Sequence, residues 1–355
     1  MTDLDQRALL PVVASAVAEE WAALRGEDTA RTDPFAWGAD TAVGGEALPA
    51  DSLALVRLAT RIGQMFHLEE AGAGDNLLRF RTLGDWAEMA ATAVAEVGKI
   101  TFLTSGTTGE PKPRSHRLDW LQQEAAFLAG YLRRTAPGRR RVHSLAPPHH
   151  IYGFLFATLL PPALGLPVRQ AGHPAHWQPG RLEPGDLVVG FPLVWQHLAE
   201  RLPAFPAGIH GVTSTAPCPA ELQRRLREQG LAGLTEVFGS SETGGVGLRE
   251  GPEAPFELMA HWLPGEPGEL VRRTPDGGEA AVTFDTDHIH WQTPRRFRPQ
   301  GRVDGVVQVG GHNVDPAAVA QVLQAHHQVA RARVALDREA DRLAAWVVPA
   351  GADTD

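Results

Sequence analysis

The sequence predicts an α/β fold with a layered sheet, preceded by a small helical bundle and followed by a short α+β lobe. Residues 1–97 carry apolar side chains at helical spacing and lack strand-like runs. Over residues 98–301 short apolar runs alternate with helical stretches, and residues 302–355 add a compact β-α-β-β series. Alternating strands and helices are typical of a layered core with a largely parallel sheet.

The N-terminal bundle is expected to contain three helices. Residues 7–24 and 52–66 both place apolar side chains at helical spacing. Thr82 opens the third helix, because Asp85 follows three residues later and completes a capping box. The second helix should bury one apolar face and keep its arginines outside. We expect Leu53, Val56, Ile62 and Phe66 on that face, with Arg57 and Arg61 off it.

The core should interleave strands and helices along the chain. The clearest strands are expected at residues 100–103, 142–145, 187–191, 212–215 and 234–238, and the clearest helices at 117–133, 193–202 and 219–229. In the C-terminal lobe we expect strands at 306–309, 332–336 and 344–348, with a helix from Pro316 to about residue 324.

Composition excludes several classes of protein. The net charge is −9, with 42 acidic and 33 basic residues, whereas non-specific nucleic-acid binders and binders of anionic membranes are usually basic. Cys218 is the single cysteine, so an internal disulfide and a multi-cysteine zinc module are excluded. The start of the chain lacks a basic region typical of a signal peptide, and the apolar run 151–168 contains prolines. We therefore expect a cytoplasmic location, no membrane insertion and no nucleic-acid partner.

The most informative segment runs from Ile100 to Lys112, where a strand leads into a loop rich in hydroxyls and glycines. Glycines let the backbone approach a phosphate, hydroxyls and amides donate to its oxygens, and a lysine supplies a compact cation. The spacing is not that of a Walker A loop; a surface turn is the alternative. Lys112 is informative because Lys99 is the only other lysine. The candidate phosphate-binding residues are Thr104, Ser105, Gly106, Thr107, Thr108, Gly109 and Lys112.

This loop, TSGTTGEPK, resembles the phosphate loop of the adenylate-forming superfamily, which includes acyl- and aryl-CoA synthetases, adenylation domains and luciferases. Residues 238–243 are similar to the family's aromatic-Gly-x-Thr-Glu motif. The resemblance implies that Phe238, followed by Gly239, stacks on adenine. It also implies that Ser241 contacts the α-phosphate and that Glu242 holds Mg²⁺. A carboxylate makes independent sense there, since Mg²⁺ prefers oxygen ligands.

Residues 301–305 are similar to the family's hinge motif. By that resemblance Arg302 would hydrogen-bond the ribose, and Asp304 would be the hinge about which the C-terminal lobe rotates. Asp287 stands where the family places the aspartate that binds both ribose hydroxyls, and Asp285 is a competing candidate. The resemblance thus makes Lys112, Glu242 and Asp304 the catalytic candidates.

Residues 147–153 resemble the loop ahead of the family's acyl pocket and place His150 against the substrate. The resemblance adds Ser214, Thr215 and Ala216 as lining of the same pocket. The adjacent His149 and His150 invite a metal interpretation, as do His288 and His290. No Asp, Glu or Cys at ligand spacing accompanies either pair, which argues against zinc.

The resemblance has departures. A helical bundle replaces the family's large α/β region before the phosphate loop, and Gln308 and Ala318 stand where lysine and glutamate are usual. The family's C-terminal catalytic lysine is missing, so we expect a truncated lobe after the hinge and impaired adenylation. The bundle weakly resembles an acyl carrier protein, in which Ser52 would carry phosphopantetheine. Pro49 departs from that pattern, and Asp-Ser-Leu is also typical of a helix N-cap.

The sequence is interpreted as an AMP-binding acyl or aryl ligase that uses ATP and Mg²⁺. It would pass a small-molecule carboxylate through an acyl-adenylate to a thiol, either that of CoA or the phosphopantetheine of an acyl carrier protein. Two alternatives stay open: a catalytically degenerate nucleotide-binding pseudoenzyme or scaffold, and a carrier protein fused to a degenerate ligase. The expected organisation is a bundle over 1–97, an adenylate-forming core over 98–301 and a truncated lobe over 302–355.

Overall fold

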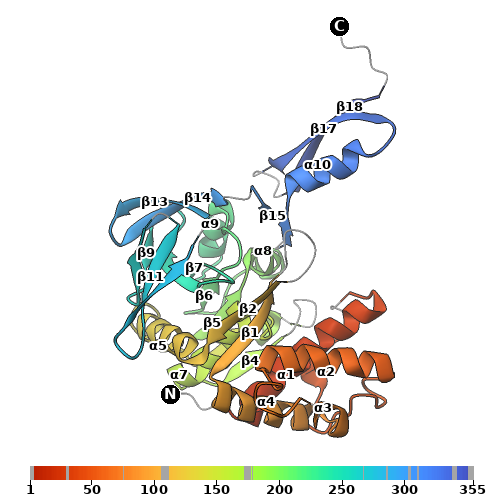
Figure 1. Cartoon of the computed structure of the whole chain (residues 1–355). Coiled ribbons are helices and arrows are strands. Elements are labelled where there is room, and N and C mark those ends of the chain that lie inside the picture. The colour runs from red at the N-terminus through yellow and green to blue at the C-terminus, as the bar shows by residue number, and fades with distance from the viewer. Residues whose placement is uncertain are drawn as a thin grey trace.

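The computed structural model describes residues 4–28, 32–74, 76–104, 112–171, 177, 179–266, 268–284, 287–302, 305–309, 312–337 and 342–350. Figure 1 shows a group of helices at the N-terminus, a central body around a large sheet, and a C-terminal lobe that projects from that body. The lobe consists of α10 (Pro316–Gln324), β17 (Val329–Asp337) and β18 (Arg342–Pro349), and the short pair β15 (Val307–Val309) and β16 (His312–Val314) precedes it.

The three helices predicted for the N-terminal bundle are confirmed. The bundle contains α1 (Gln6–Arg25), α2 (Ser52–Phe66), α3 (Asn76–Arg79) and α4 (Leu83–Val97), with a 3₁₀ turn at Pro34–Ala36. The Asp51 carboxylate accepts from the Ala54 N–H at 2.8 Å and caps α2. Thr82 and Asp85 form the predicted capping box at the start of α4. The helix boundaries therefore follow from local side-chain chemistry.

The predicted buried face of α2 is confirmed for Ile62 and Phe66 but is wrong for Leu53, Val56 and Arg61. Leu53 is 71% exposed and Val56 is 46% exposed, whereas Arg61 is only 4% exposed. The residues that pack inward recur every three or four positions on a stripe that shares only Ile62 and Phe66 with the predicted one, because α1 and α4 both contact this helix. They are Leu55, Leu58, Ile62, Met65 and Phe66. Arg61 can point inward because Glu19 of α1 lies 3.8 Å from its guanidinium.

The central body is built on a nine-stranded sheet with the order β13-β14-β9-β8-β7-β6-β5-β3-β4. Its parallel half consists of β3 (Arg141–Ser144), β4 (Val168–Gln170), β5 (Asp186–Gly190), β6 (His210–Thr213) and β7 (Gly233–Ser240). Its antiparallel half consists of β8 (Gly244–Glu250), β9 (Phe256–Leu258), β13 (Asp287–Thr293) and β14 (Arg296–Arg302). The α/β class is as predicted, but the expectation of a largely parallel sheet is wrong for the half beyond β7.

Helices connect and cover this sheet. They are α5 (Leu118–Thr135), α6 (Ile151–Gly153), the π-helical turn Phe154–Leu159, α7 (Leu160–Leu164), α8 (Pro192–Arg201) and α9 (Ala220–Glu228), with a 3₁₀ turn at Pro179–Arg181. A small sheet of β10 (Trp262–Pro264), β11 (Glu269–Arg273) and β12 (Glu279–Thr283) follows β9. Within the described part of the chain, no helix has both the length and the apolar character needed to cross a membrane.

The strand predicted at residues 100–103 lies outside the large sheet. It forms β1 (Lys99–Thr104), which pairs with β2 (Lys112–Arg117) in a separate antiparallel hairpin. The buried Phe102 ring lies 5.4 Å from that of Phe154, and the Thr101 hydroxyl lies 2.9 Å from His67 Nε2 on the bundle side. The hairpin is thus held between the bundle and the central body (Figure 1).

One hydrophobic cluster joins the bundle to the central body. It includes Leu9 of α1, Trp86 of α4, Phe102 of β1, Val237 of β7 and Phe297 of β14. A second cluster, with Trp195 and Leu226 among its members, lies beneath α8 and α9. The bundle therefore packs as part of the main core; the domain boundary at residue 97 remains a prediction.

Removing the capping box should destabilise the bundle measurably. We expect Thr82→Ala to lower the free energy of unfolding by about 1 kcal/mol, because the Asp85 N–H loses its side-chain acceptor at 3.1 Å. Thr92→Ala, an exposed position in the interior of the same helix, is the control and should change stability by less than about 0.5 kcal/mol. Urea unfolding followed by circular dichroism measures both. Equal stability of the two variants would contradict the capping role.

Candidate active site

A tight turn after β7 carries part of the segment 238–243, which resembles the aromatic-Gly-x-Thr-Glu motif. The Thr243 hydroxyl donates to the Gly244 carbonyl at 2.8 Å and accepts from the Ser240 N–H at 3.2 Å. The Ser240 hydroxyl accepts from the Glu242 N–H at 3.2 Å. These bonds fix the backbone of the turn and leave the Glu242 carboxylate outside the network.

The strand that follows the predicted phosphate loop contacts this turn. Arg114 Nε donates to Glu242 Oε1 at 3.1 Å, and the buried His116 donates from Nε2 to the Ser241 carbonyl at 2.7 Å. Burial lowers the pKa of His116, which keeps the ring neutral near pH 7. Two motifs separated by more than a hundred residues therefore meet through side chains that the sequence did not single out.

The two ends of the predicted phosphate loop lie on the paired strands β1 and β2. Thr104 at the end of β1 and Lys112 at the start of β2 are Cα partners across the hairpin, and Lys112 is exposed. The other candidates of this loop, namely Ser105, Gly106, Thr107, Thr108 and Gly109, lie outside the described residues.

The buried carboxyl group of Glu124 supports the turn after β7. Glu124 of α5 accepts from the Gly245 N–H at 2.8 Å. The φ of +71° at Gly244 favours glycine, and a Cβ there would lie 2.7 Å from Glu124 Oε2 and displace that carboxyl. Burial raises the pKa of Glu124 to about 7, although the charge of Arg272 opposes that rise. No sequence pattern marked Glu124, because a charged residue on a helix is usually exposed.

Phe238 and Gly239 lie where β7 and β8 approach each other. The half-buried ring of Phe238 lies 5.4 Å from Phe256 and from Phe297. A Cβ at Gly239 would lie 2.0 Å from the Gly244 carbonyl oxygen, so only glycine fits. This packing places Phe238 directly before the turn; its stacking on adenine remains a prediction.

The two predicted ribose-binding residues are brought together by strand pairing. Asp287 at the start of β13 and Arg302 at the end of β14 are Cα partners in the antiparallel register. The strand order puts β14, β9 and β8 between β13 and β7, so the sheet ladder alone does not join this pair to Glu242. Asp285 and Asp304 lie outside the described residues.

Ser214, Thr215 and Ala216 follow the end of β6, beside β7. The Ser214 hydroxyl donates to the Val237 carbonyl at 2.8 Å. Thr215 has a φ of +75°, which costs a β-branched residue on the order of 1–3 kcal/mol and is typical of functional loops. Tyr152, which sequence reasoning missed as a site residue, donates its hydroxyl to the Gly190 carbonyl at 2.9 Å. It ties the His150 segment to the carboxyl end of β5.

The bundle contributes a side chain beside His150. Glu19 of α1 lies 3.1 Å from His149 Nε2 and 3.5 Å from His150 Nε2. Burial by itself raises the pKa of Glu19, but His149, His150 and Arg61 together hold it well below its usual range. We expected no carboxylate beside this histidine pair. That expectation is wrong, because the fold brings Glu19, which is distant in the sequence, next to both rings.

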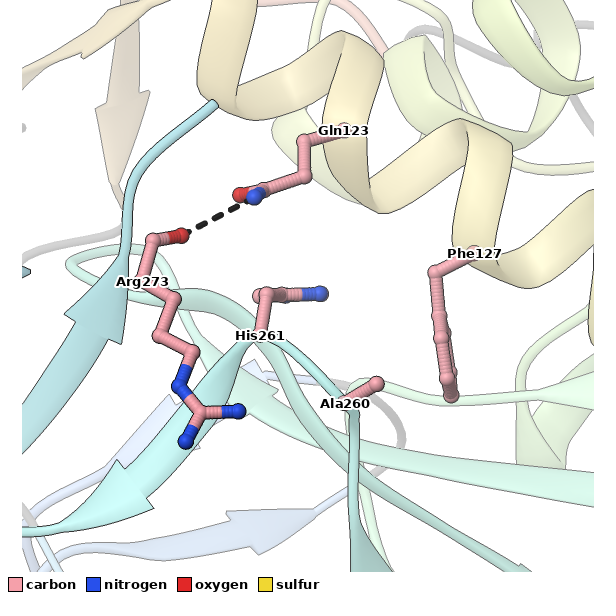
Figure 2. Close-up of a pocket in the computed structure, with 5 residues that line it drawn as sticks. All are labelled: Gln123, Phe127, Ala260, His261 and Arg273. Carbon is pink, nitrogen blue, oxygen red and sulfur yellow. Dashed lines mark hydrogen bonds between the residues drawn. The ribbon is translucent and has the colours of Figure 1, made fainter. Parts of the chain in front are cut away.

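A separate cavity of about 250 Å³ lies against α5, and none of the predicted site residues lines it (Figure 2). Gln123 donates to the Arg273 carbonyl at 2.9 Å, and the ring of His261 points into the space near Phe127. The wall is formed by Gln123, Phe127, Ala260, His261 and Arg273. This cavity is not part of the site described above.

Comparisons with known proteins give consistent results. Residues 86–275 match the family of AMP-binding enzymes. A protein named 4-coumarate–CoA ligase from Halorhodospira halophila is 37% identical over 362 residues, which cover 100% of this chain and 90% of that protein. A second protein of that name, from Rhodobacter capsulatus, is 38% identical over 88% of this chain and 81% of its own. These relatives are ligases, so they lend no support to the alternative of a pseudoenzyme.

Solved structures match at the level of the fold. An o-succinylbenzoate CoA synthetase from Bacillus subtilis aligns with a TM-score of 0.52 and 19% identity, over 70% of this chain and 58% of that chain. MatB from Rhodopseudomonas palustris, solved with ATP bound, aligns with a TM-score of 0.51 and 18% identity, over 98% of this chain and 84% of its own.

The raised pKa of Glu124 predicts how stability changes with pH. Because that pKa lies near 7 in the folded state and near 4.5 ordinarily, the stabilisation is complete below about pH 4.5 and is lost as the pH rises through about 7. Glu124→Gln keeps an oxygen for the Gly245 N–H and has no proton to lose. When the pH is raised from about 5 to about 8, we expect the free energy of unfolding of the variant, relative to that of the wild type, to increase by at least ~1 kcal/mol.

Urea unfolding at the two pH values measures this gain. Glu96→Gln, an exposed position on α4, is the control and should show no pH-dependent difference. A stability difference for Glu124→Gln that does not change with pH would contradict the raised pKa.

Proposed function

Because the chain belongs to the AMP-binding enzyme family of the adenylate-forming superfamily, we propose that it activates an aryl carboxylate with ATP and transfers it to the thiol of CoA. One observation carries the proposal: the strand that follows the phosphate loop contacts the turn that bears Glu242, through Arg114 and His116. This contact gathers cationic and anionic groups where the phosphates of ATP would bind.

The proposed reaction has two steps. An oxygen of the substrate carboxylate attacks the α-phosphorus of ATP, and pyrophosphate leaves. The sulfur of CoA then attacks the acyl carbon of the adenylate; AMP leaves and the thiol proton passes to solvent. Lys112 and Arg114 would neutralise negative charge on the phosphates, and the rigid turn after β7 would hold them in place.

Glu242 is the proposed ligand for the Mg²⁺ that accompanies ATP. The donor set fits a hard cation, since the carboxylate stands outside the hydrogen-bond network of its own turn and phosphate oxygens would complete the coordination. The ion supplies charge neutralisation of the phosphates. Arg114 holds the carboxylate at 3.1 Å and orients it toward β2.

We propose an aryl acid of the 4-coumarate type as the substrate. Relatives named 4-coumarate–CoA ligase support this class, and so does the aromatic character of the segment around His150. Tyr152 packs against Phe156 with ring centroids 4.9 Å apart. A flat ring can pack against such side chains at little entropic cost.

CoA is favoured over a carrier protein as the acceptor. The Asp51 carboxylate caps α2 through the Ala54 N–H, which accounts for the Asp-Ser-Leu tripeptide structurally. The arginines of α2 also differ from the acidic helix of the carrier proteins that the bundle resembles. Pantetheinylation of Ser52 is therefore not part of the proposal.

The positions of the two lysines predict which of the two steps, adenylation or transfer to CoA, is slower. Lys99 and Lys112 are the only lysines of the sequence, so residues 302–355 offer none to hold the attacking carboxylate. Losing one such electrostatic contact typically lowers a rate by ~10²–10³. Adenylation is therefore proposed to be the slow step and transfer from the adenylate to CoA the faster one.

Replacing the two lysines separately tests the proposed function. With 4-coumarate, CoA and Mg·ATP, we expect the wild type to form the thioester and Lys112→Ala to lower kcat/KM by ~10²–10³. Lys99→Ala is the control, because Lys99 lies at the opposite end of the hairpin and pairs with Glu70 at 2.9 Å. Its activity should stay within about twofold of the wild type.

Three results would each contradict a different part of the proposed function. No thioester from any aryl or aliphatic acid would overturn the ligase proposal. Equal losses in the two lysine variants would overturn the role of Lys112 alone. Adenylation measured by pyrophosphate exchange at a typical enzyme turnover of ~1–10 s⁻¹ and faster than the transfer step would contradict only the proposed order of the two rates.

A further inference from the structure

We propose that Glu19, His149 and His150 form a binding site for Zn²⁺ at the contact between α1 and the segment before α6. Among the residues that the structure describes, these three are the group whose ligand atoms converge, all within 4.8 Å of one another. Two imidazoles with one carboxylate suit Zn²⁺ better than Mg²⁺ or Ca²⁺, which prefer oxygen.

The distances between the ligand atoms fit a tetrahedral ion. Glu19 lies 3.1 Å from His149 Nε2 and 3.5 Å from His150 Nε2. Zinc bonds of about 2.0–2.1 Å place tetrahedral ligands about 3.3 Å apart, so small side-chain movements would bring all three onto one ion. Three protein ligands leave a fourth position for water or another small ligand.

Both histidines are already oriented as metal ligands are. The Ser15 hydroxyl lies 2.7 Å from Nδ1 of His149, and both residues are buried. If that nitrogen carries the proton, Nε2, which lies 3.1 Å from the Glu19 carboxylate, is left with a lone pair that an ion can accept. The ring of His150 is held by a hydrogen bond to the backbone of Leu103. Such outer contacts usually fix the tautomer of a metal-bound histidine.

One neighbouring charge opposes the ion. The guanidinium of Arg61 lies 3.8 Å from the Glu19 carboxylate, while Glu20 and Arg57 pair with each other at 2.7 Å. Arg61 makes no hydrogen bond from either terminal nitrogen, so it can turn away without losing one. We therefore expect a site that binds Zn²⁺ reversibly.

The site has a consequence that rests on the proposed function. His150 is a residue of the predicted acyl pocket, so a zinc ion bound to it would hold its ring against α1. Zinc would then reduce ligase activity by withdrawing a substrate-contacting group. The binding itself can be measured without any activity.

Calorimetric titration of the metal-stripped full chain with ZnCl₂ tests the site. We expect one tight site in the wild type, its loss in Glu19→Ala and His149→Ala, and an affinity ~10–100-fold lower in Ser15→Ala, which leaves all three ligands in place. Mg²⁺ should not compete. The matched control is the double variant His326→Ala/His327→Ala, which removes another adjacent pair with rings 4.6 Å apart and should bind as the wild type does.

Co²⁺ provides the second readout, since a tetrahedral Co²⁺ site absorbs visible light strongly and that band should disappear in Glu19→Gln. Circular dichroism and the melting temperature identify any variant that fails to fold. If the alanine variants fail, the zinc affinity of Glu19→Gln decides whether the site exists, because a half-exposed position tolerates this substitution. Unchanged zinc affinity in folded Glu19→Gln and His149→Ala would overturn the site. Zinc binding without loss of ligase activity would overturn only the inhibitory consequence, and a chain without ligase activity would leave the binding result valid.

Discussion

The hydrogen bond from His116 to the Ser241 carbonyl joins two parts of the site that no sheet joins. The hairpin of β1 and β2 carries the ends of the predicted phosphate loop but lies outside the nine-stranded sheet, whereas the turn with Glu242 extends from that sheet. Their relative position therefore depends on side chains. Burial keeps His116 neutral, so its Nε2–H can donate without the cost of a buried charge. Arg114 adds an ionic contact beside it. The arrangement of the proposed nucleotide site depends on these two contacts.

The N-terminal bundle takes part in the same arrangement from the other side. Its core is continuous with that of the central body, and α2 contacts β1. Glu19 reaches the histidines before α6, and His67 lies beside Thr101 of β1. A bundle that merely preceded the enzyme as a linked carrier would not need such contacts. It therefore packs as part of the central body, and its Glu19 lies beside His150 of the predicted acyl pocket.

Much of the fold could be predicted from local patterns, which also marked the residues of the candidate site. The capping box at Thr82, the helix over residues 52–66 and the apolar strand at 187–191 are encoded by neighbouring residues, and the motifs marked Lys112, Glu242 and Arg302. The strands beyond β7 were missed because segments such as DHIHWQT contain only two apolar residues, Ile289 and Trp291, so their alternation is too short to stand out. Arg61 was assigned to the surface and Glu124 was not singled out, because burial of charge depends on partners distant in sequence. Contacts such as Ser15 with His149, 134 residues apart, exist only in the folded chain.

We propose that the contact between β2 and the turn after β7 assembles the nucleotide site. Calorimetric titration with Mg·ATP tests it most directly, with the wild type, His116→Ala and His67→Asn compared. His67 lies on the opposite side of the same hairpin, and asparagine tolerates its positive φ of 58°. We expect binding by the wild type and by His67→Asn, and an affinity about tenfold or more lower for folded His116→Ala, equivalent to ~1.4 kcal/mol. No nucleotide binding by the wild type, or equal affinity in His116→Ala, would contradict it.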